Sequence, residues 1–484
     1  MATFSQAVAS AKSAEVSRTE NGMKAWATSD SKVLDLFGKI GSGRGRDMSR
    51  EFTAALAEDQ NLAMRVLLWA RDVRGGAGER QTFRSLLSAL ETANPALAGK
   101  IMHKVPELGR WDDLFAYRDP INRKAALRMY ADALMNGDGL AAKWAPRLTS
   151  SKKAITAGKK VKLQNANELR KFMMLSPKEY RQILVGSTRV VEQLMCAKRW
   201  DEINFSHVPS LASARYQKAF GKNAADAYSA YIRELQKPQE ERDPKVKINA
   251  GAVYPYDVVK SLRNGNVAVA DAQFQALPNY VGDTKILPMV DVSGSMGVPL
   301  AGNTTAMDVA ISLGLYLSDR TSSDFKDMFL TFSGNSKINV LKGTLSQKFQ
   351  QLSRAEWGMN TNLHSAFDAI LGVALKGKVS QENMPDYVLI LSDMQFDTCV
   401  RNDDSALQMI RRKYENAGYK MPSVIFWNLT ARAENTPVKT NDKGTALVSG
   451  FSPAIMASVL GADPEEFTPY NMMLKTIMND RYSY

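Results

Sequence analysis

The fold of this chain is decided by residues 286–296, which read ILPMVDVSGSM. Five apolar residues run into the pattern Asp-x-Ser-Gly-Ser, which predicts a buried parallel strand that carries polar side chains onto the loop at its carboxyl end. Those side chains are Asp291, Ser293 and Ser295, whose oxygens are the hard donors that Mg²⁺ or Mn²⁺ prefers. Gly294 allows a turn tight enough for both serines to face one ion. The loop is therefore predicted to be a metal site at the edge of an α/β sheet.

This motif resembles the metal-ion-dependent adhesion site (MIDAS) of von Willebrand factor A domains. The resemblance implies two more ligands from later loops, and both are present: Thr361 precedes a helical pattern, and Asp393 ends the strand-like run YVLILSD at residues 387–393. It implies ligation by the two serines directly, by Thr361 directly or through water, and by the two aspartates through water. One position would stay open for a carboxylate or phosphate from a partner. In a simpler alternative the first loop is only a strand-to-helix turn, with Asp and Ser as capping residues.

The composition is globular, with 44% hydrophobic residues in a chain of 484, which is room for about two to four domains. No apolar run reaches the roughly eighteen residues that a membrane-spanning helix needs, and the N-terminus lacks a basic-then-apolar signal pattern. We therefore expect a cytoplasmic protein without membrane contact. The two cysteines, Cys196 and Cys399, and the three histidines form no zinc-binding or disulfide pattern.

The net charge of +13 is unevenly distributed along the chain. Residues 285–484 contain 19 lysines and arginines against 20 acidic residues, which leaves 44 against 30 for residues 1–284. A basic half joined to a neutral half is typical of a polyanion-binding domain fused to a second domain. The alternative is a basic helical domain whose lysines only keep it soluble.

Helical spacing dominates residues 1–284, which we predict to form a HEAT-like α-solenoid of stacked helix pairs. No strand is expected before residue 250, residues 1–30 are given a peripheral role, and the lysine-rich residues 150–162 are predicted to be an exposed loop. Residues 285–484 alternate helix and strand, which predicts a doubly wound parallel sheet. The expected architecture is α followed by α/β.

The two halves together resemble the Ro autoantigen family of TROVE-domain ribonucleoproteins. Residues 71–80, RDVRGGAGER, are similar to that family's Arg-Asp-x-Arg-Gly-Gly-Lys-Gly-Glu-Arg segment, with Ala77 in place of the usual Lys. A branch described as domain-of-unknown-function family 2828 is closer still. The segments that carry this resemblance are LRKF at 169–172, SPKEY at 176–180, CAKRWD at 196–201, SDMQFD at 392–397 and GFSP at 450–453.

The Ro resemblance implies a closed ring of helical repeats that binds a small structured RNA on its basic outer face and passes single-stranded 3′ ends through its hole. At 284 residues the helical part is short for such a ring. Arginine and lysine attract phosphate without reading sequence, which suits recognition of RNA by shape and free ends. For each basic residue the alternative is an ordinary solvated charge or an internal ion pair. The candidate RNA contacts are Arg71, Arg74, Arg80, Arg110, Lys152, Lys153, Lys159, Lys160, Arg170, Lys171, Lys198 and Arg199.

Three functions are consistent with these features. The favoured one is a non-catalytic RNA-binding scaffold, a monomer within a ribonucleoprotein, whose partners are small non-coding RNA and single-stranded RNA ends. The second is a protein-interaction module in which a Mg²⁺ or Mn²⁺ ion at the MIDAS captures an acidic protein ligand or a nuclease. The third, a metal-dependent nuclease, lacks the second carboxylate cluster that a hydrolase needs. We therefore do not expect an enzyme.

Overall fold

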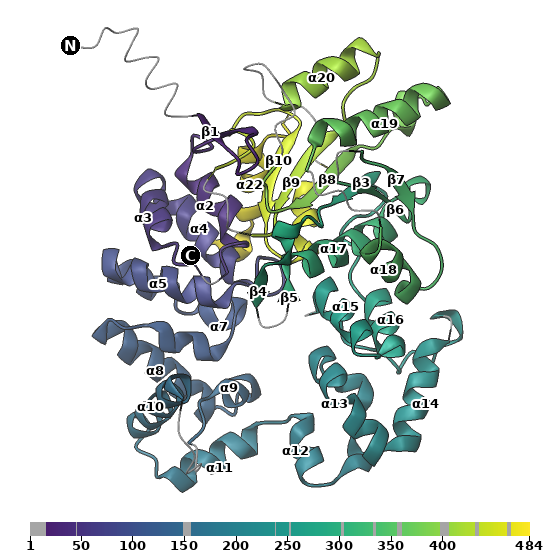
Figure 1. Cartoon of the computed structure of the whole chain (residues 1–484). Helices are drawn as coiled ribbons and strands as arrows, with labels where there is room; N and C mark the ends of the chain where they lie inside the picture. Colours follow the sequence, from purple (N-terminus) through teal and green to yellow (C-terminus); the bar gives the residue numbers. More distant parts are fainter. Residues whose placement is uncertain are drawn as a thin grey trace, which may run out of the picture.

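The structure, a computed structural model, is mixed α/β, with a helical first part and a six-stranded, mostly parallel sheet in the second part (Figure 1). This confirms the predicted order of α followed by α/β. The residues described are 16–44, 46–148, 156–237, 239–250, 253–301, 304–332, 335–355, 361–396, 406–430, 435–461 and 466–484. Within them, no helix has the length and apolar character needed to cross a membrane.

Helices account for most of the first part. Local sequence explains several of their starts: Ser176 accepts a hydrogen bond from the Glu179 amide, Glu179 accepts one from the Ser176 amide, and Pro177 takes the first helical position of α11. The helices are α2 (Lys32–Ile40), α3 (Ser49–Glu58), α4 (Gln60–Arg71), α5 (Arg80–Ala93), α6 (Pro95–Lys100), α7 (Lys104–Leu108), α8 (Pro120–Met135), α9 (Gly139–Trp144), α10 (Ala157–Phe172), α11 (Pro177–Ser187), α12 (Val191–Cys196), α13 (Ser210–Asn223), α14 (Ala225–Gln236), α15 (Pro255–Arg263) and α16 (Val267–Gln275).

The loop predicted at residues 150–162 is corrected over residues 157–162, which belong to helix α10, and residues 150–155 lie outside the described residues. Lys159, Lys160 and Lys162 lie in its first two turns, because Ala166 and Leu169, three residues apart, bury one face of the helix in the core. The sequence prediction gave too much weight to the run of lysines, which a helix tolerates on its exposed face. Lys152 and Lys153 fall outside the described residues.

A short hairpin near the N-terminus was also missed. Strands β1 (Val16–Arg18) and β2 (Lys24–Trp26) pair in antiparallel fashion, although no strand was expected before residue 250. Gly22 has φ +86°, which favours glycine, and Asn21-Gly22 is a typical turn sequence between two strands. The signal was therefore present in the sequence, but strands of three residues are too short to show alternation.

The sheet has the strand order β10-β9-β8-β3-β6-β7, in which only the pairing of β7 with β6 is antiparallel. The central strand β3 is buried at all five residues, as its apolar run predicts. A small antiparallel pair, β4 (Pro299–Ala301) and β5 (Thr304–Thr305), lies outside this sheet. The sheet strands are β3 (Ile286–Val290), β6 (Met328–Thr331), β7 (Ile338–Val340), β8 (Tyr387–Ser392), β9 (Ser423–Asn428) and β10 (Thr445–Ser449).

Helices cover both faces of this sheet (Figure 1). One face packs against α19 and α20 in a core that includes Phe367 and Phe426, and the other contributes Val290 and Trp427 to the core of the N-terminal helices. The helices of the second part are α17 (Ala306–Arg320), α18 (Leu345–Ser353), α19 (Leu363–Gly377), α20 (Ala406–Asn416), α21 (Met456–Val459) and α22 (Pro469–Ile477).

The helical part contacts the sheet part at both of its ends. At the β10 edge, the Gly41 amide of the α2 C-cap donates to Ser449 Oγ at 3.0 Å, and that hydroxyl donates to the Phe37 carbonyl at 3.1 Å. At the other end, Arg263 of α15 pairs with Asp308 of α17 at 2.5 Å. In Figure 1 the helices leave the sheet through α5 and α8, pass α11 and α12, and return through α13 to α16. The division predicted at residues 284/285 thus separates two parts that share one hydrophobic core, and it stays a prediction.

Candidate functional site

The loop after β3 holds the first group of predicted metal ligands. The Asp291 side chain is fully buried: Oδ1 accepts from the Ser293 amide at 2.9 Å, and Oδ2 accepts from the Ser392 hydroxyl at 2.6 Å. The hydroxyls of Ser293 and Ser295 lie 3.0 Å apart, so both serines face the same side of the turn. Ser392, which fixes the Asp291 carboxylate, was not singled out in the sequence, although it precedes Asp393 directly.

Asp393 is brought beside this loop because β8 is the direct neighbour of β3, with Val290 opposite Leu391. Its side chain is fully buried, Oδ1 accepts from the Gln395 amide at 3.2 Å, and Oδ2 is buried without a partner among the described residues. Burial, and then the negative charge of Asp393, raise the pKa of Asp291 to about 6. Two adjacent buried carboxyl groups with one unmet oxygen form an arrangement that a cation would stabilise.

Thr361 joins the loop that follows Asp393. It is buried, and its hydroxyl donates to the Gln395 carbonyl at 2.8 Å. The Asn21 side-chain amide also approaches this hydroxyl, at 3.5 Å. The residues before Thr361, 356–360, lie outside the described residues. All five predicted ligands therefore lie on loops at the carboxyl ends of β3 and β8 or on a loop hydrogen-bonded to them.

The donor set fits a hard divalent cation better than zinc. Among the described residues no three side chains of His, Cys, Asp or Glu gather into a metal-binding cluster. A site of two aspartates with serine and threonine hydroxyls needs no such cluster, because hydroxyl and water oxygens complete the shell of Mg²⁺ or Mn²⁺. The buried Asp393 Oδ2, which has no hydrogen-bond partner among the described residues, agrees with a bound cation.

The N-terminal hairpin reaches this site, which the sequence did not indicate. Thr19 Oγ1 donates to the Phe396 carbonyl at 2.5 Å, the Glu20 amide donates to Gln395 Oε1 at 2.5 Å, and Asn21 Nδ2 donates to the Gln395 carbonyl at 2.8 Å. Residues 16–26, given a peripheral role from sequence, are thus attached to the loop that carries Asp393.

Arg71 is not available to RNA, and its predicted role is corrected. Its side chain is 1% exposed, and its Nη2 lies 2.7 Å from Asp113 Oδ2. Gly109 makes room for this pair, because a Cβ there would lie 2.5 Å from Arg71 Nε. The partner lies more than forty residues away along the chain, so adjacent residues gave no sign of it.

The next residue, Asp72, connects the first part to the C-terminus. Its buried carboxylate accepts from Arg481 Nε at 2.5 Å, from Arg481 Nη2 at 3.0 Å and from the Tyr482 hydroxyl at 3.1 Å. The Arg74 amide donates to the same carboxylate at 3.0 Å. At least the first two residues of the segment that resembles the Ro family, Arg71 and Asp72, therefore serve the packing of the chain.

The other predicted RNA contacts are mostly at the surface. Arg110 pairs with Asp112 through two hydrogen bonds of 2.8 Å, and Arg199 pairs with Glu202. Arg170 Nη1 donates to the Leu175 carbonyl at 2.6 Å. The exposed residues of the set are Arg74, Arg80, Lys159, Lys160, Lys171, Lys198 and Arg199, whereas Arg110 and Arg170 are partly buried.

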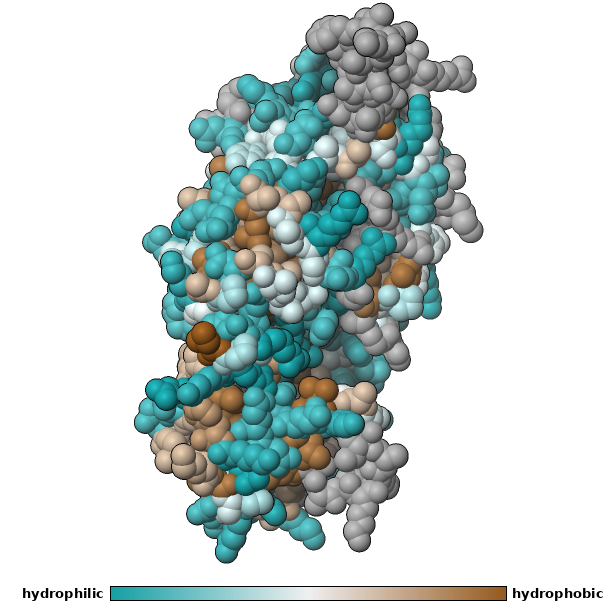
Figure 2. All heavy atoms as spheres, turned by 90° about the vertical axis from the view of Figure 1, so that its left-hand side faces the viewer, coloured by the Kyte–Doolittle hydropathy of each residue, from teal (hydrophilic) through white to brown (hydrophobic). Residues whose placement is uncertain are grey.

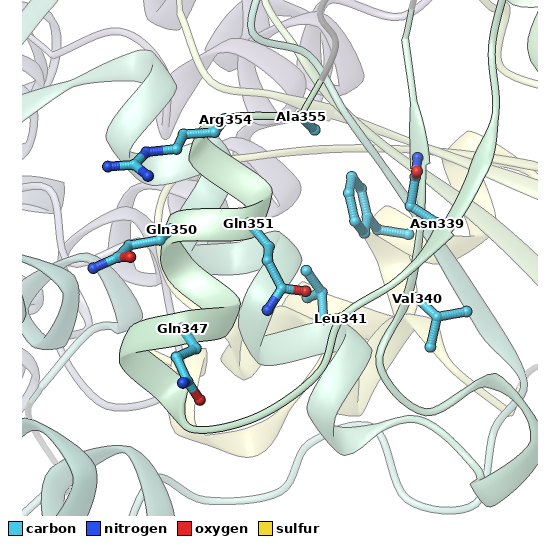
Figure 3. Close-up of a pocket in the computed structure, with 9 residues that line it drawn as sticks. Asn339, Val340, Leu341, Gln347, Gln350, Gln351, Arg354 and Ala355 are labelled. Carbon is cyan, nitrogen blue, oxygen red and sulfur yellow. The ribbon is translucent and has the colours of Figure 1, made fainter.

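A separate pocket of about 450 Å³ lies between α18 and the edge strand β7 (Figure 3). Gln351 lines it, and its side chain accepts from the Lys342 amide at 3.1 Å and donates to the Lys342 carbonyl at 2.6 Å. Phe329, Val340 and Leu341 line the sheet side. The residues that line the pocket include none of the predicted metal ligands.

Comparison with known proteins places this chain in a family. Residues 124–285 match the family described as Domain of unknown function (DUF2828), and residues 285–477 match Domain of unknown function (DUF7788). The uncharacterized protein L728 of Acanthamoeba polyphaga mimivirus is 31% identical over 521 residues, which cover 96% of this chain and 87% of that protein. The chain belongs to the family of L728. The sequence-based resemblance to family 2828 is confirmed for residues 124–285, whereas its segments at 392–397 and 450–453 lie in the part that matches DUF7788.

Among solved structures, the crystal structure of the Deinococcus radiodurans Ro protein is similar to this member of the L728 family. The TM-score is 0.49 and the identity 15%, with 93% of this chain and 100% of the Ro chain covered. At these values the likeness carries no argument about function, which has to rest on the charges and contacts described above.

Proposed function

We propose that this protein is a non-catalytic RNA-binding scaffold of a cytoplasmic ribonucleoprotein, monomeric within it, that binds small structured RNA and single-stranded RNA ends. The observation that carries the proposal is the charge asymmetry: residues 1–284 contain 44 basic against 30 acidic residues, whereas residues 285–484 are nearly neutral. Lys159, Lys160 and Lys171 extend this excess along the exposed side of α10. Such a surface attracts phosphate groups without reading the bases.

The proposed architecture is a HEAT-like solenoid whose ends are joined by a von Willebrand factor A-like domain, so that the chain forms a ring. Support comes from the two contact regions between the parts, α2 on β10 and α15 on α17. The surface over the N-terminal helices is largely hydrophilic, with apolar side chains gathered in its lower part (Figure 2). A hydrophilic face of this kind is suited to an RNA ligand rather than to an obligate protein interface.

The second part of the proposal is a divalent-metal MIDAS at the carboxyl ends of β3 and β8. Mg²⁺, or Mn²⁺, would be held by Asp291, Ser293, Ser295, Thr361 and Asp393. When bound, the ion supplies a positive charge with an open position for a partner's carboxylate or phosphate. The chain's own contribution is to hold the carboxylates rigidly, through Ser392 on Asp291 and Gln395 on Asp393.

RNA binding is tested with the purified protein and fluorescent single-stranded oligonucleotides at several salt concentrations. We expect the logarithm of the association constant to fall linearly with the logarithm of the salt concentration, because bound phosphates release counterions. Sequencing of copurifying RNA then identifies the ligand. Affinity no greater than that of a neutral control protein would disprove the proposal, and RNA cleavage with Mn²⁺ would disprove the non-catalytic role.

A protein-interaction module at the MIDAS is the second candidate, favoured by the unmet Asp393 Oδ2 beside Asp291. In this case the ligand is an acidic protein or a nuclease, and RNA is not the physiological partner. Partner capture should then be lost with EDTA and with Asp291→Ala. A partner that stays bound under both conditions would argue against this function.

A further inference from the structure

Three arginines and two aspartates are joined by ion pairs near the turn that follows α7, and a fourth arginine, Arg80, lies one helical turn before Arg84 on α5. Asp113 is fully buried and binds two of them: Arg71 Nη2 and Arg84 Nη2 each lie 2.7 Å from its carboxylate. Asp112 binds Arg110 at 2.8 Å and Arg84 at 3.3 Å. These six groups carry four positive and two negative charges. Both carboxylates are already shared by Arg71, Arg84 and Arg110, and the remaining arginine is Arg80.

Arg80 has no carboxylate of its own among the described residues. Burial, and then the positive charges of Arg110 and Arg84, lower the pKa of its guanidinium. Although its side chain is exposed, a cation beside two other cations is repelled by them and would be stabilised by an anion. The carboxylate of the preceding residue, Glu79, instead accepts from Arg44 Nε through both of its oxygens at 3.0 Å.

The position of Arg80 in α5 adds to this electrostatic repulsion. Arg80 is the first residue of a helix of fourteen residues, and the N-cap Glu79 gives no side-chain hydrogen bond to the first turn. The free amides at a helix N-terminus carry partial positive charge, which disfavours a cation and favours an anion. The Thr82 hydroxyl of this first turn and Arg71 Nη1 are also buried without a hydrogen-bond partner among the described residues.

The neighbouring guanidinium groups are held in place. Arg110 is fixed by its two bonds to Asp112 and lies over the Trp144 ring, with its Cζ 3.5 Å from the ring centroid. Arg84 is fixed by Asp113 through Nε at 2.7 Å. An incoming anion would therefore meet donors that have already lost most of their conformational freedom.

We propose that the Arg80, Arg84 and Arg110 cluster is a binding site for one phosphodiester group of single-stranded RNA, with Arg80 as the main contact. The inference rests on the proposed RNA function and names a site for it. A phosphodiester fits because it carries a single charge, accepts several hydrogen bonds and matches the guanidinium fork. RNA is favoured over an acidic peptide because the surplus positive charge continues along the rest of residues 1–284.

The test compares Arg80→Gln with Arg128→Gln, which removes one exposed charge on α8 outside the cluster. Binding of a fluorescent twenty-nucleotide oligouridine is measured from low to high salt. We expect Arg80→Gln to weaken binding roughly tenfold at low salt and to lower the salt slope by about one, whereas Arg128→Gln changes affinity less than twofold. The melting temperature of Arg80→Gln should equal or exceed that of the wild type, because a positive charge beside Arg84 and Arg110 is removed.

A second measurement separates this site from RNA binding in general. Inorganic pyrophosphate should raise the melting temperature of the wild type and of Arg128→Gln but not of Arg80→Gln. If the wild-type protein binds RNA and the two variants bind it with equal affinity, the proposed site is overturned and the proposed function stays intact. Pyrophosphate binding through Arg80 without RNA binding would keep an anion site and overturn both the RNA ligand and the proposed function. Arg80-dependent binding of polyglutamate in place of RNA would assign the site to an acidic peptide.

Discussion

Replacing Asp72 by alanine should loosen the connection between the helical part and the C-terminus. The buried carboxylate accepts two hydrogen bonds from Arg481 and one from Tyr482, and its loss leaves the guanidinium and the buried hydroxyl without that partner. Breaking one side of a buried ion pair typically costs about 3–5 kcal/mol. Because the Arg481 side chain is 29% exposed and can recover some hydration, we expect about 3 kcal/mol.

Amide hydrogen exchange measures this cost locally. Asp72→Ala should lower the opening free energy of α22 and the residues after it by about 3 kcal/mol, together with a lower melting temperature. Arg74→Ala is the matched control, since its exposed side chain lies in the same loop, and it should stay within about 0.5 kcal/mol. The reasoning is refuted if the two variants exchange alike.

Acid should produce the same loosening. Burial raises the pKa of Asp72, but hydrogen bonds from Arg481 and from the Arg74 amide outweigh it, so the net shift is downward. A depressed folded-state pKa stabilises the protein above the unfolded value of about 3.9, and this stability is lost as the pH falls through that value toward the folded one. The protection of the α22 amides against hydrogen exchange should therefore be constant near neutral pH and should decrease at pH values under about 4.

Three further predictions concern other parts of the chain. Gly109→Ala should destabilise the protein by about 1–3 kcal/mol in thermal unfolding, because the new Cβ would lie 2.5 Å from Arg71 Nε. The control variant Gly158→Ala has open space around its new Cβ and should be neutral or slightly stabilising. The Mn²⁺ affinity measured by calorimetry should decrease at pH values under about 6, where Asp291 takes up a proton, and Asp291→Ala should abolish it. An affinity independent of pH would contradict the site. Asn21→Ala should raise hydrogen exchange at Gln395, since the Asn21 side chain donates to its carbonyl, and unchanged exchange there would show that the hairpin is not needed to order this loop.

The sheet was predictable because its strands carry their own signal. Strands β3, β8, β9 and β10 are buried on both faces, so each reads as a continuous apolar run, and β3 and β8 end in Asp291 and Ser392-Asp393. A parallel sheet brings such ends to one edge, which is why loops one hundred residues apart could be assigned to one site. Helix α10 was missed for the opposite reason, because only Ala166 and Leu169 are buried in the core and the many charged residues around them obscure the helical pattern.

The sequence by itself determined the order of α and α/β parts, the parallel sheet, the polar loops at its carboxyl edge and the location of the excess charge, since each depends on residues close together in the chain. Only the tertiary structure decided what the charged residues do. Arg71 and Arg80 belong to one ten-residue segment, yet Arg71 is buried against Asp113, whereas Arg80 has no carboxylate partner within the described part of the chain. Asp72 likewise finds Arg481 four hundred residues away. An ion pair forms between groups that packing brings together, and sequence distance carries no information about such pairs.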